Sequence, residues 1–210
     1  MARSLTLDNI QDKKHKTFDF DGVWRDVLGE LEVAGLMLIY GMEKNGKTWL
    51  ALLLAEMLSY HGKVLYVSAE EGVKNSFKQS TIRAKLRRGN RNLHFCSYLD
   101  VAEIGAILEK RRGPMVVLLD NATIYEDELK YGGMRRMFVR HCDSKRIILL
   151  SHEKNREPFP APAQVARRLA DVIVRVEGLA CHISGRCPGG TLAIDEHKAK
   201  LFHGNDITVL

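Results

Sequence analysis

The segment from Gly41 to Thr48 carries the clearest chemical signal in the 210-residue sequence. Its order is Gly-Met-Glu-Lys-Asn-Gly-Lys-Thr, so the second glycine is followed directly by a lysine and a threonine. Glycines at this spacing let the backbone turn so that successive N–H groups point toward one anion. The lysine ammonium adds a positive charge, and the threonine hydroxyl can bind a metal ion. The spacing therefore predicts a loop that holds the phosphates of a nucleotide.

The residues on either side of this loop support that prediction. Leu36–Tyr40 is an uninterrupted apolar run, which is typical of a buried strand, and 47–60 has a helical pattern. A helix that starts at the loop brings the positive end of its dipole to the anion. We expect Lys47 to reach the β- and γ-phosphates of ATP and Thr48 to bind Mg²⁺. The expected nucleotide-binding residues are Gly41, Met42, Glu43, Lys44, Asn45, Gly46, Lys47, Thr48 and Trp49.

A second metal-binding group is expected at the end of another apolar strand, 115–120. Asp120 closes that strand, and a carboxylate there can complete the Mg²⁺ site. The next residue is Asn121, where many P-loop ATPases have the glutamate that activates water. The general base must then lie elsewhere in this chain.

Two carboxylates follow the strand expected at 64–68. They are Glu70 and Glu71, and a carboxylate near the γ-phosphate can polarise water for in-line attack. We expect Glu70 to be the base and keep Glu71 as the alternative.

Alternating strands and helices must position these groups. Apolar runs separated by helical patterns predict an α/β fold with a mainly parallel sheet between helices and an antiparallel C-terminal extension. The polar residues 1–17 are expected to form a tail or an arm to a partner, and 18–210 a single domain. Strands are expected at 36–40, 64–68, 93–96, 115–120, 146–151, 172–176, 180–184, 191–194 and 200–203, and helices at 47–60, 73–88, 101–112, 134–142 and just before Ala170.

Composition limits the classes of partner. The chain has 32 Lys and Arg against 26 Asp and Glu, and its net charge of +6 is compatible with nucleic acid or phosphorylated ligands. With 45% hydrophobic residues it is neither disordered nor fibrous. Its apolar runs all fall short of the roughly 20 residues that span a bilayer, so we expect a cytoplasmic protein without a membrane segment.

Taken together, these motifs resemble those of the RecA-like ATPases, in particular the compact branch that includes bacterial RadA and the RepA-type and DnaB-type hexameric helicases. The resemblance covers about 18–204 and depends on the segments 41–48, 64–71 and 170–178, on Asp120 and on the pair Ser151-His152. It implies Mg²⁺-dependent ATP hydrolysis, with Glu70 as the catalytic glutamate. It also implies that Ser151 or His152 senses the γ-phosphate.

The same resemblance suggests an assembly. Lys198 and Lys200 are similar to the Lys-x-Lys pair that RecA-like proteins insert into a neighbouring subunit's ATP site, which implies a homo-oligomer with ATP sites between subunits. On a strand, positions two apart point the same way, so both could face one neighbour. The alternative is a pair of solvated lysines.

Single-stranded DNA is the expected macromolecular partner, in recombination, repair or replication. The candidate DNA-binding loops are 122–133 and 153–164, and the second carries Lys154, Arg156 and Phe159. Further basic clusters occur at 83–91, 135–140 and 167–168. The alternative function is an ATP-dependent switch or scaffold of the same fold without motor activity.

Overall fold

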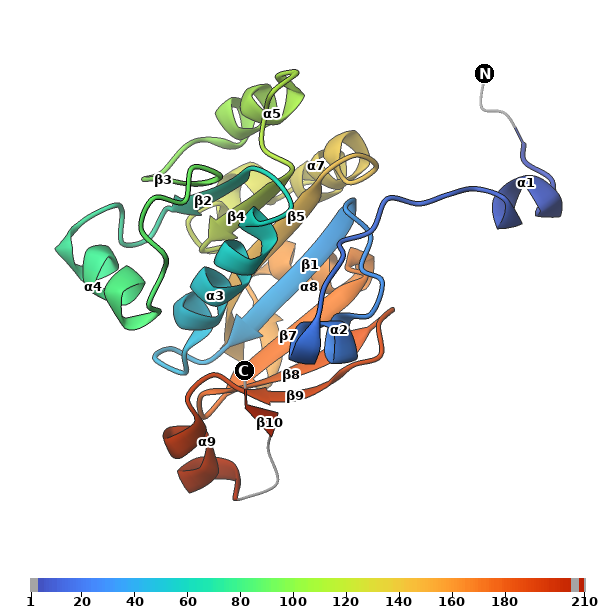
Figure 1. The fold of residues 1–210 in the computed structure, drawn as a ribbon. Helices are drawn as coiled ribbons and strands as arrows, with labels where there is room; N and C mark the ends of the chain where they lie inside the picture. The colour runs from blue at the N-terminus through green and yellow to red at the C-terminus, as the bar shows by residue number, and fades with distance from the viewer. Residues whose placement is uncertain (1–3, 205–207, 210) are drawn as a thin grey trace.

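The computed structural model describes residues 4–204 and 208–209 and is built around one sheet between two layers of helices (Figure 1). Within these residues the strands run in the order β10-β9-β8-β7-β1-β5-β4-β2-β3, and β6 pairs with β5. The strands are β1 (Gly35–Gly41), β2 (Val64–Ser68), β3 (Leu93–Cys96), β4 (Val116–Asp120), β5 (Arg146–Lys154), β6 (Glu157–Phe159), β7 (Val172–Glu177), β8 (Ala180–Gly185), β9 (Gly190–Ala193) and β10 (Thr208–Val209). The helices are α1 (Leu7–Gln11), α2 (Gly22–Leu28), α3 (Lys47–Ser59), α4 (Asn75–Arg83), α5 (Val101–Glu109), α6 (Glu126–Leu129), α7 (Gly133–His141), α8 (Ala161–Leu169) and α9 (Glu196–His203).

The sheet has the mixed character predicted from the sequence. β1 is parallel to β5 and β7, and β2 is parallel to β3 and β4, whereas β8 is antiparallel to both of its neighbours, β7 and β9. Because parallel strands end at the same edge, the carboxyl ends of β1, β2, β4 and β5 lie side by side. Ser68 is in register with Asp120, and Gly41 with His152. The predicted α/β fold class is therefore confirmed, and this edge is where the expected site residues converge.

Each face of the sheet has its own apolar core, since successive side chains of a strand point to opposite faces. Met37 and Ile39 pack with α2, α3 and α4, whereas Leu36 and Leu38 pack with α5, α7 and α8. The central strands are buried on both faces, which is why they are continuous apolar runs rather than alternating patterns.

The structure corrects two expectations about local structure. The expected strand 200–203 is wrong, because the residues belong to α9, whose first turn is capped by the Asp195 side chain accepting from the Lys198 N–H at 3.0 Å. The helix expected at 73–88 ends at Arg83, and Lys85 follows with a left-handed φ of 55°. The residues after it form a loop that leads into β3.

A buried arginine links neighbouring segments at the amino-terminal edge of the sheet. Arg146, at the start of β5, is fully buried and donates to both carboxylate oxygens of Asp171 at 2.8 Å. It also donates to the backbone carbonyls of Glu32 and Ala34. The bidentate geometry suits Arg, and the two carbonyls accept from its Nε and Nη2. The segment before β1 is thus bound to β5 and to the start of β7.

The N-terminal segment stands away from this body. Residues 4–17 are all exposed, and α1 projects outward (Figure 1). The chain first contacts the body at His15, which lies 3.2 Å from the Glu32 carboxylate, and at Lys16, whose carbonyl accepts from the Val33 N–H at 2.8 Å. Phe18 and Phe20 are buried and stack with ring centroids 5.4 Å apart. In the described part of the chain, no helix has the length and apolar character needed to cross a bilayer.

Candidate nucleotide site

The phosphate loop lies between β1 and α3, as its sequence predicts. Gly46 precedes α3 with a φ of 100°, which favours glycine, and a side chain there would come within 2.6 Å of Leu179. A Cβ on Gly41 would overlap the carbonyl oxygen of Val176. The turn between β7 and β8 therefore packs closely on the loop, and the Gly178 N–H donates to Asn45 Oδ1 at 2.7 Å. Glycine is therefore required at these two positions for the loop to pack in this way.

Lys47 is held inside this loop. Its ammonium donates to the carbonyl of Met42 at 2.8 Å, and the residue is 9% exposed. Burial lowers the pKa of Lys47, and the carboxylates of Asp120 and Glu70 partly oppose that shift. The ammonium is therefore poorly solvated and close to negative charge. Trp49 faces elsewhere, since it packs on the core and lines a cavity with Trp24.

The two expected metal-binding groups meet. Thr48 Oγ1 lies 3.4 Å from Asp120 Oδ2, and the same carboxylate oxygen accepts from the hydroxyl of Tyr66 at 2.7 Å. A hydroxyl beside a carboxylate is an oxygen donor set that suits Mg²⁺. Burial raises the pKa of Asp120 to about 6, while the Tyr66 hydrogen bond lowers it. Without a bound cation, the protein only partly stabilises the negative charge of Asp120. A bound cation would favour the ionised form of this carboxylate.

Replacing Asp120 by Asn should stabilise the metal-free protein at pH 7. The folded pKa of Asp120 is above its ordinary value of 3.8, so ionisation costs stability as pH rises from about 4 to 6 and none of this cost exists below that window. The expected gain is about 1 to 3 kcal/mol at pH 7 and close to zero at pH 4, from roughly 1.4 kcal/mol per tenfold change in proton affinity. Urea unfolding in EDTA at both pH values measures it, and an equal effect at both would contradict the assignment.

Glu70 belongs to a polar network that the sequence did not reveal. Its carboxylate accepts from Asn121 Nδ2 at 3.0 Å, and the same amide nitrogen lies 2.5 Å from His152 Nε2. The N–H groups of Ala69 and Glu70 donate to the Asp120 carbonyl at 2.6 and 3.2 Å, which fixes the end of β2 against β4. An amide that donates to both neighbours places the His152 proton on Nδ1, which is buried without a partner in the described residues. Glu70, Asn121 and His152 therefore form one chain of contacts at the carboxyl edge.

The side chains of the remaining predicted site residues form no hydrogen bond to the side chains of this network in the described part of the chain. Ser151 is fully buried and donates to the carbonyl of Phe159 at 2.5 Å, so its hydroxyl is directed to β6. Glu71 is exposed. Lys200 pairs with Glu196 at 2.5 Å, and Lys198 lies 3.8 Å from Asp195. On a helix two positions differ by roughly 200°, so the expectation that both lysines face the same way is wrong.

Asn121 is the residue that sequence reasoning undervalued. The sequence shows it only as a position that lacks a glutamate, although it follows Asp120 directly and therefore lies at the carboxyl edge. The family resemblance includes the segment 170–178, but it does not predict that Gly178 and Leu179 contact the loop, from which they are more than 130 positions away in the sequence.

Comparisons with known proteins agree with this architecture. No protein-family model matches the chain. A curated relative, DNA repair protein RadA from Aquifex aeolicus (strain VF5), is 28% identical over 179 residues, which cover 80% of this chain and 39% of the relative. The chain thus corresponds to well under half of that relative's length.

A solved structure gives independent support for the fold. The flagellar accessory protein FlaH from Methanocaldococcus jannaschii superposes with a TM-score of 0.58 at 20% identity, over 84% of this chain and 91% of that one. At this identity the likeness concerns the fold. Together the two comparisons support the RecA-like P-loop ATPase architecture predicted from the sequence.

Proposed function

We propose that this chain, which has the fold of the RecA-like P-loop ATPases, binds ATP with Mg²⁺ and hydrolyses it to ADP and phosphate. The observation that carries the proposal is the convergence of Lys47, Thr48, Asp120 and Glu70 at the carboxyl edge of one parallel sheet. Ligands of open α/β sheets bind at that edge.

Each of these residues would have a separate role in hydrolysis. The loop amides and Lys47 would hold the β- and γ-phosphates, with the ammonium released from the Met42 carbonyl. Thr48 and Asp120 would hold Mg²⁺, which supplies neutralisation of the phosphate charge. Glu70 would accept a proton from water as the water oxygen attacks the γ-phosphorus and the bond to the β–γ bridging oxygen breaks. Asn121 and His152 would orient the Glu70 carboxylate.

We further propose that the protein uses this activity on DNA as a homo-oligomer. The name of the curated relative supports a DNA-related role. The turn between β5 and β6 adds a physical argument, because Lys154 lies 5.5 Å from the centre of the Phe159 ring and Arg156 is exposed beside it. A cation beside an aromatic ring is a combination that binds single strands.

The deciding experiment is the ATPase rate with and without single-stranded DNA, on a sample of known oligomeric state. A DNA-dependent ATPase should turn over several times faster with the strand, and the stimulation should fall steeply with salt because phosphate contacts release counterions. A rate that ignores both DNA and salt would contradict the DNA role and would point to an ATP-dependent switch or scaffold.

Changing Lys198 and Lys200 together to alanine tests the sites between subunits. If one of these lysines, which point to different sides of α9, reaches a neighbour's ATP, turnover should fall about tenfold or more while nucleotide affinity is retained, since a cation supplied in trans acts on the transition state. Changing the exposed pair Lys13 and Lys14 to alanine removes the same charge elsewhere and serves as the control. Unchanged turnover in the first variant would exclude the role.

A further inference from the structure

The net charge of the protein is concentrated in one stretch of sequence. Residues 72–99, here called the basic segment, contain seven Lys and Arg and no Asp or Glu. The rest of the chain has 25 basic against 26 acidic residues and is nearly neutral. The basic segment comprises α4, the loop after it and β3, the edge strand of the sheet.

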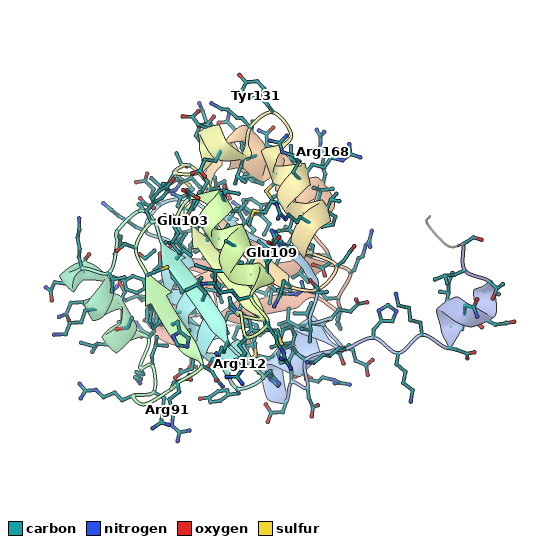
Figure 2. All side chains as sticks on the ribbon, turned by 90° about the horizontal axis from the view of Figure 1, so that it is seen from above. Arg91, Glu103, Glu109, Arg112, Tyr131 and Arg168 are labelled. Atoms are coloured by element: carbon teal, nitrogen blue, oxygen red, sulfur yellow. The ribbon has the colours of Figure 1, made fainter. Side chains whose placement is uncertain are left out.

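The positive charges of these seven side chains are not neutralised within the described fold. All seven are exposed, and no carboxylate in residues 4–204 forms an ion pair with any of them. Figure 2 shows the labelled side chain of Arg91 directed away from the body. Seven like charges held together repel one another, so their proximity costs stability unless an anion compensates them.

The basic segment also surrounds an apolar pocket. The pocket lies between α4 and β3, has a volume of about 660 Å³, and is lined by Phe77, Leu86, Leu93 and Phe95. The rings of Phe77 and Phe95 meet edge to face, with centroids 5.5 Å apart. This volume is in the ordinary range for a ligand pocket.

Cations line the same pocket from two elements. Lys74 and Lys78 come from the start and first turn of α4, four positions apart and so on one face of the helix, and Arg87 and Arg88 come from the loop. Asn75 and Thr81 add polar groups among them. The lining thus combines an apolar floor, in which Phe77 is only 2% exposed and Phe95 is half-buried, with amide and hydroxyl groups and four cations.

We propose that the basic segment binds single-stranded nucleic acid, with one base in the α4–β3 pocket and phosphates on Lys74, Lys78, Arg87 and Arg88. Interfaces with nucleic acid are much more positively charged than those between proteins, where Lys is depleted, and a stretch without a single acid fits the former. Bases enter apolar and aromatic pockets without regard to sequence, while cations follow the backbone. The surface is separate from the β5–β6 turn and from the phosphate loop, and the inference does not depend on ATP hydrolysis.

The test is fluorescence anisotropy of a labelled 20-nucleotide oligo(dT) with the full chain, without ATP, between 50 and 200 mM salt. Changing Lys74, Lys78 and Arg88 together to glutamate should weaken binding more than tenfold and lower the slope of log affinity against log salt by about 2, at roughly 0.7 per lost phosphate contact. The matched control, Lys110, Arg111 and Arg112 to glutamate, makes the same charge change at another exposed site and should shift affinity less than threefold.

A charge-neutral change separates base binding from general attraction. Thr81→Trp should fill the pocket and weaken oligo(dT) about fivefold or more, in the range of one lost base stack, whereas Thr81→Ser should not. Equal weakening by both triple variants, no effect of Thr81→Trp, or no binding at 50 mM salt would overturn the proposal. So would a polyglutamate peptide that binds through the same residues when oligo(dT) does not. Lys47→Ala should bind oligo(dT) normally, so failure of the ATPase proposal would leave this result intact.

Discussion

Lys47→Ala should reduce ATP hydrolysis by about a thousandfold or more, to the background rate. Lys47 is 9% exposed and is close to the Asp120 and Glu70 carboxylates, so its charge is weakly screened by water and its loss should be felt strongly at the phosphates. Removal of a preorganised charge from a poorly solvated site commonly costs 10²–10³ or more in turnover. Here the same charge also binds the ground state, so nucleotide affinity should fall as well.

Phosphate release and calorimetry with Mg²⁺ measure the two effects separately. Lys110→Ala removes an exposed lysine at the end of α5 and is the matched control, which should keep the wild-type rate. Full turnover in Lys47→Ala would contradict the assignment of the phosphate loop. Calorimetry of the wild type that detects no binding of ATP or ADP would contradict nucleotide binding altogether.

The second large effect is expected for Glu70→Gln. Glutamine keeps the size of the side chain and a carbonyl oxygen that can accept from Asn121, so the contact network should survive while the base is lost. Turnover should fall by about 10²–10⁴, the usual contribution of general base catalysis, with ATP affinity nearly unchanged.

Glu71→Gln is the natural comparison, because it makes the same change one residue further on, at a residue that is exposed like Glu70 but has no side-chain hydrogen bond among the described residues. It should retain most of the activity. If Glu71→Gln were the inactive variant and Glu70→Gln the active one, the base would be Glu71 and the Asn121 network would need another explanation. Single-turnover kinetics on both variants distinguishes loss of chemistry from loss of binding.

The sequence predicted best where one local rule decides the structure. Val64–Ser68 and Leu93–Cys96 form strands with the predicted bounds, since each is a short apolar run closed by polar residues or glycine. The loop and α3 followed from glycine spacing and a helix start. These elements determine where the parallel strands end, and so they place Asp120 and Glu70 at the same edge of the sheet.

The predictions from the sequence failed where tertiary contacts or a helix cap determine the local structure. The residues 200–203 alternate too briefly to define a strand, and the helix there depends on Asp195, whose capping role was overlooked. α2 was missed because its only buried residues are Val27 and Leu28, too few for a periodic pattern. The Glu70–Asn121–His152 contacts join three strands, and no residue spacing in the sequence predicts them.

The buried Arg146 bears on how small a working piece of this protein can be made. A fragment that began at Gly35 would contain every predicted nucleotide-binding residue but would lack the Glu32 and Ala34 carbonyls that take two of the guanidinium's donors. The ion pair with Asp171 would remain, but buried N–H donors of a charged group left without acceptors commonly cost about 1–3 kcal/mol, which is a sizeable share of the stability of a domain this size. Shortened versions for expression should therefore start ahead of Phe18, so that they include the segment before the first strand together with the predicted nucleotide-binding residues.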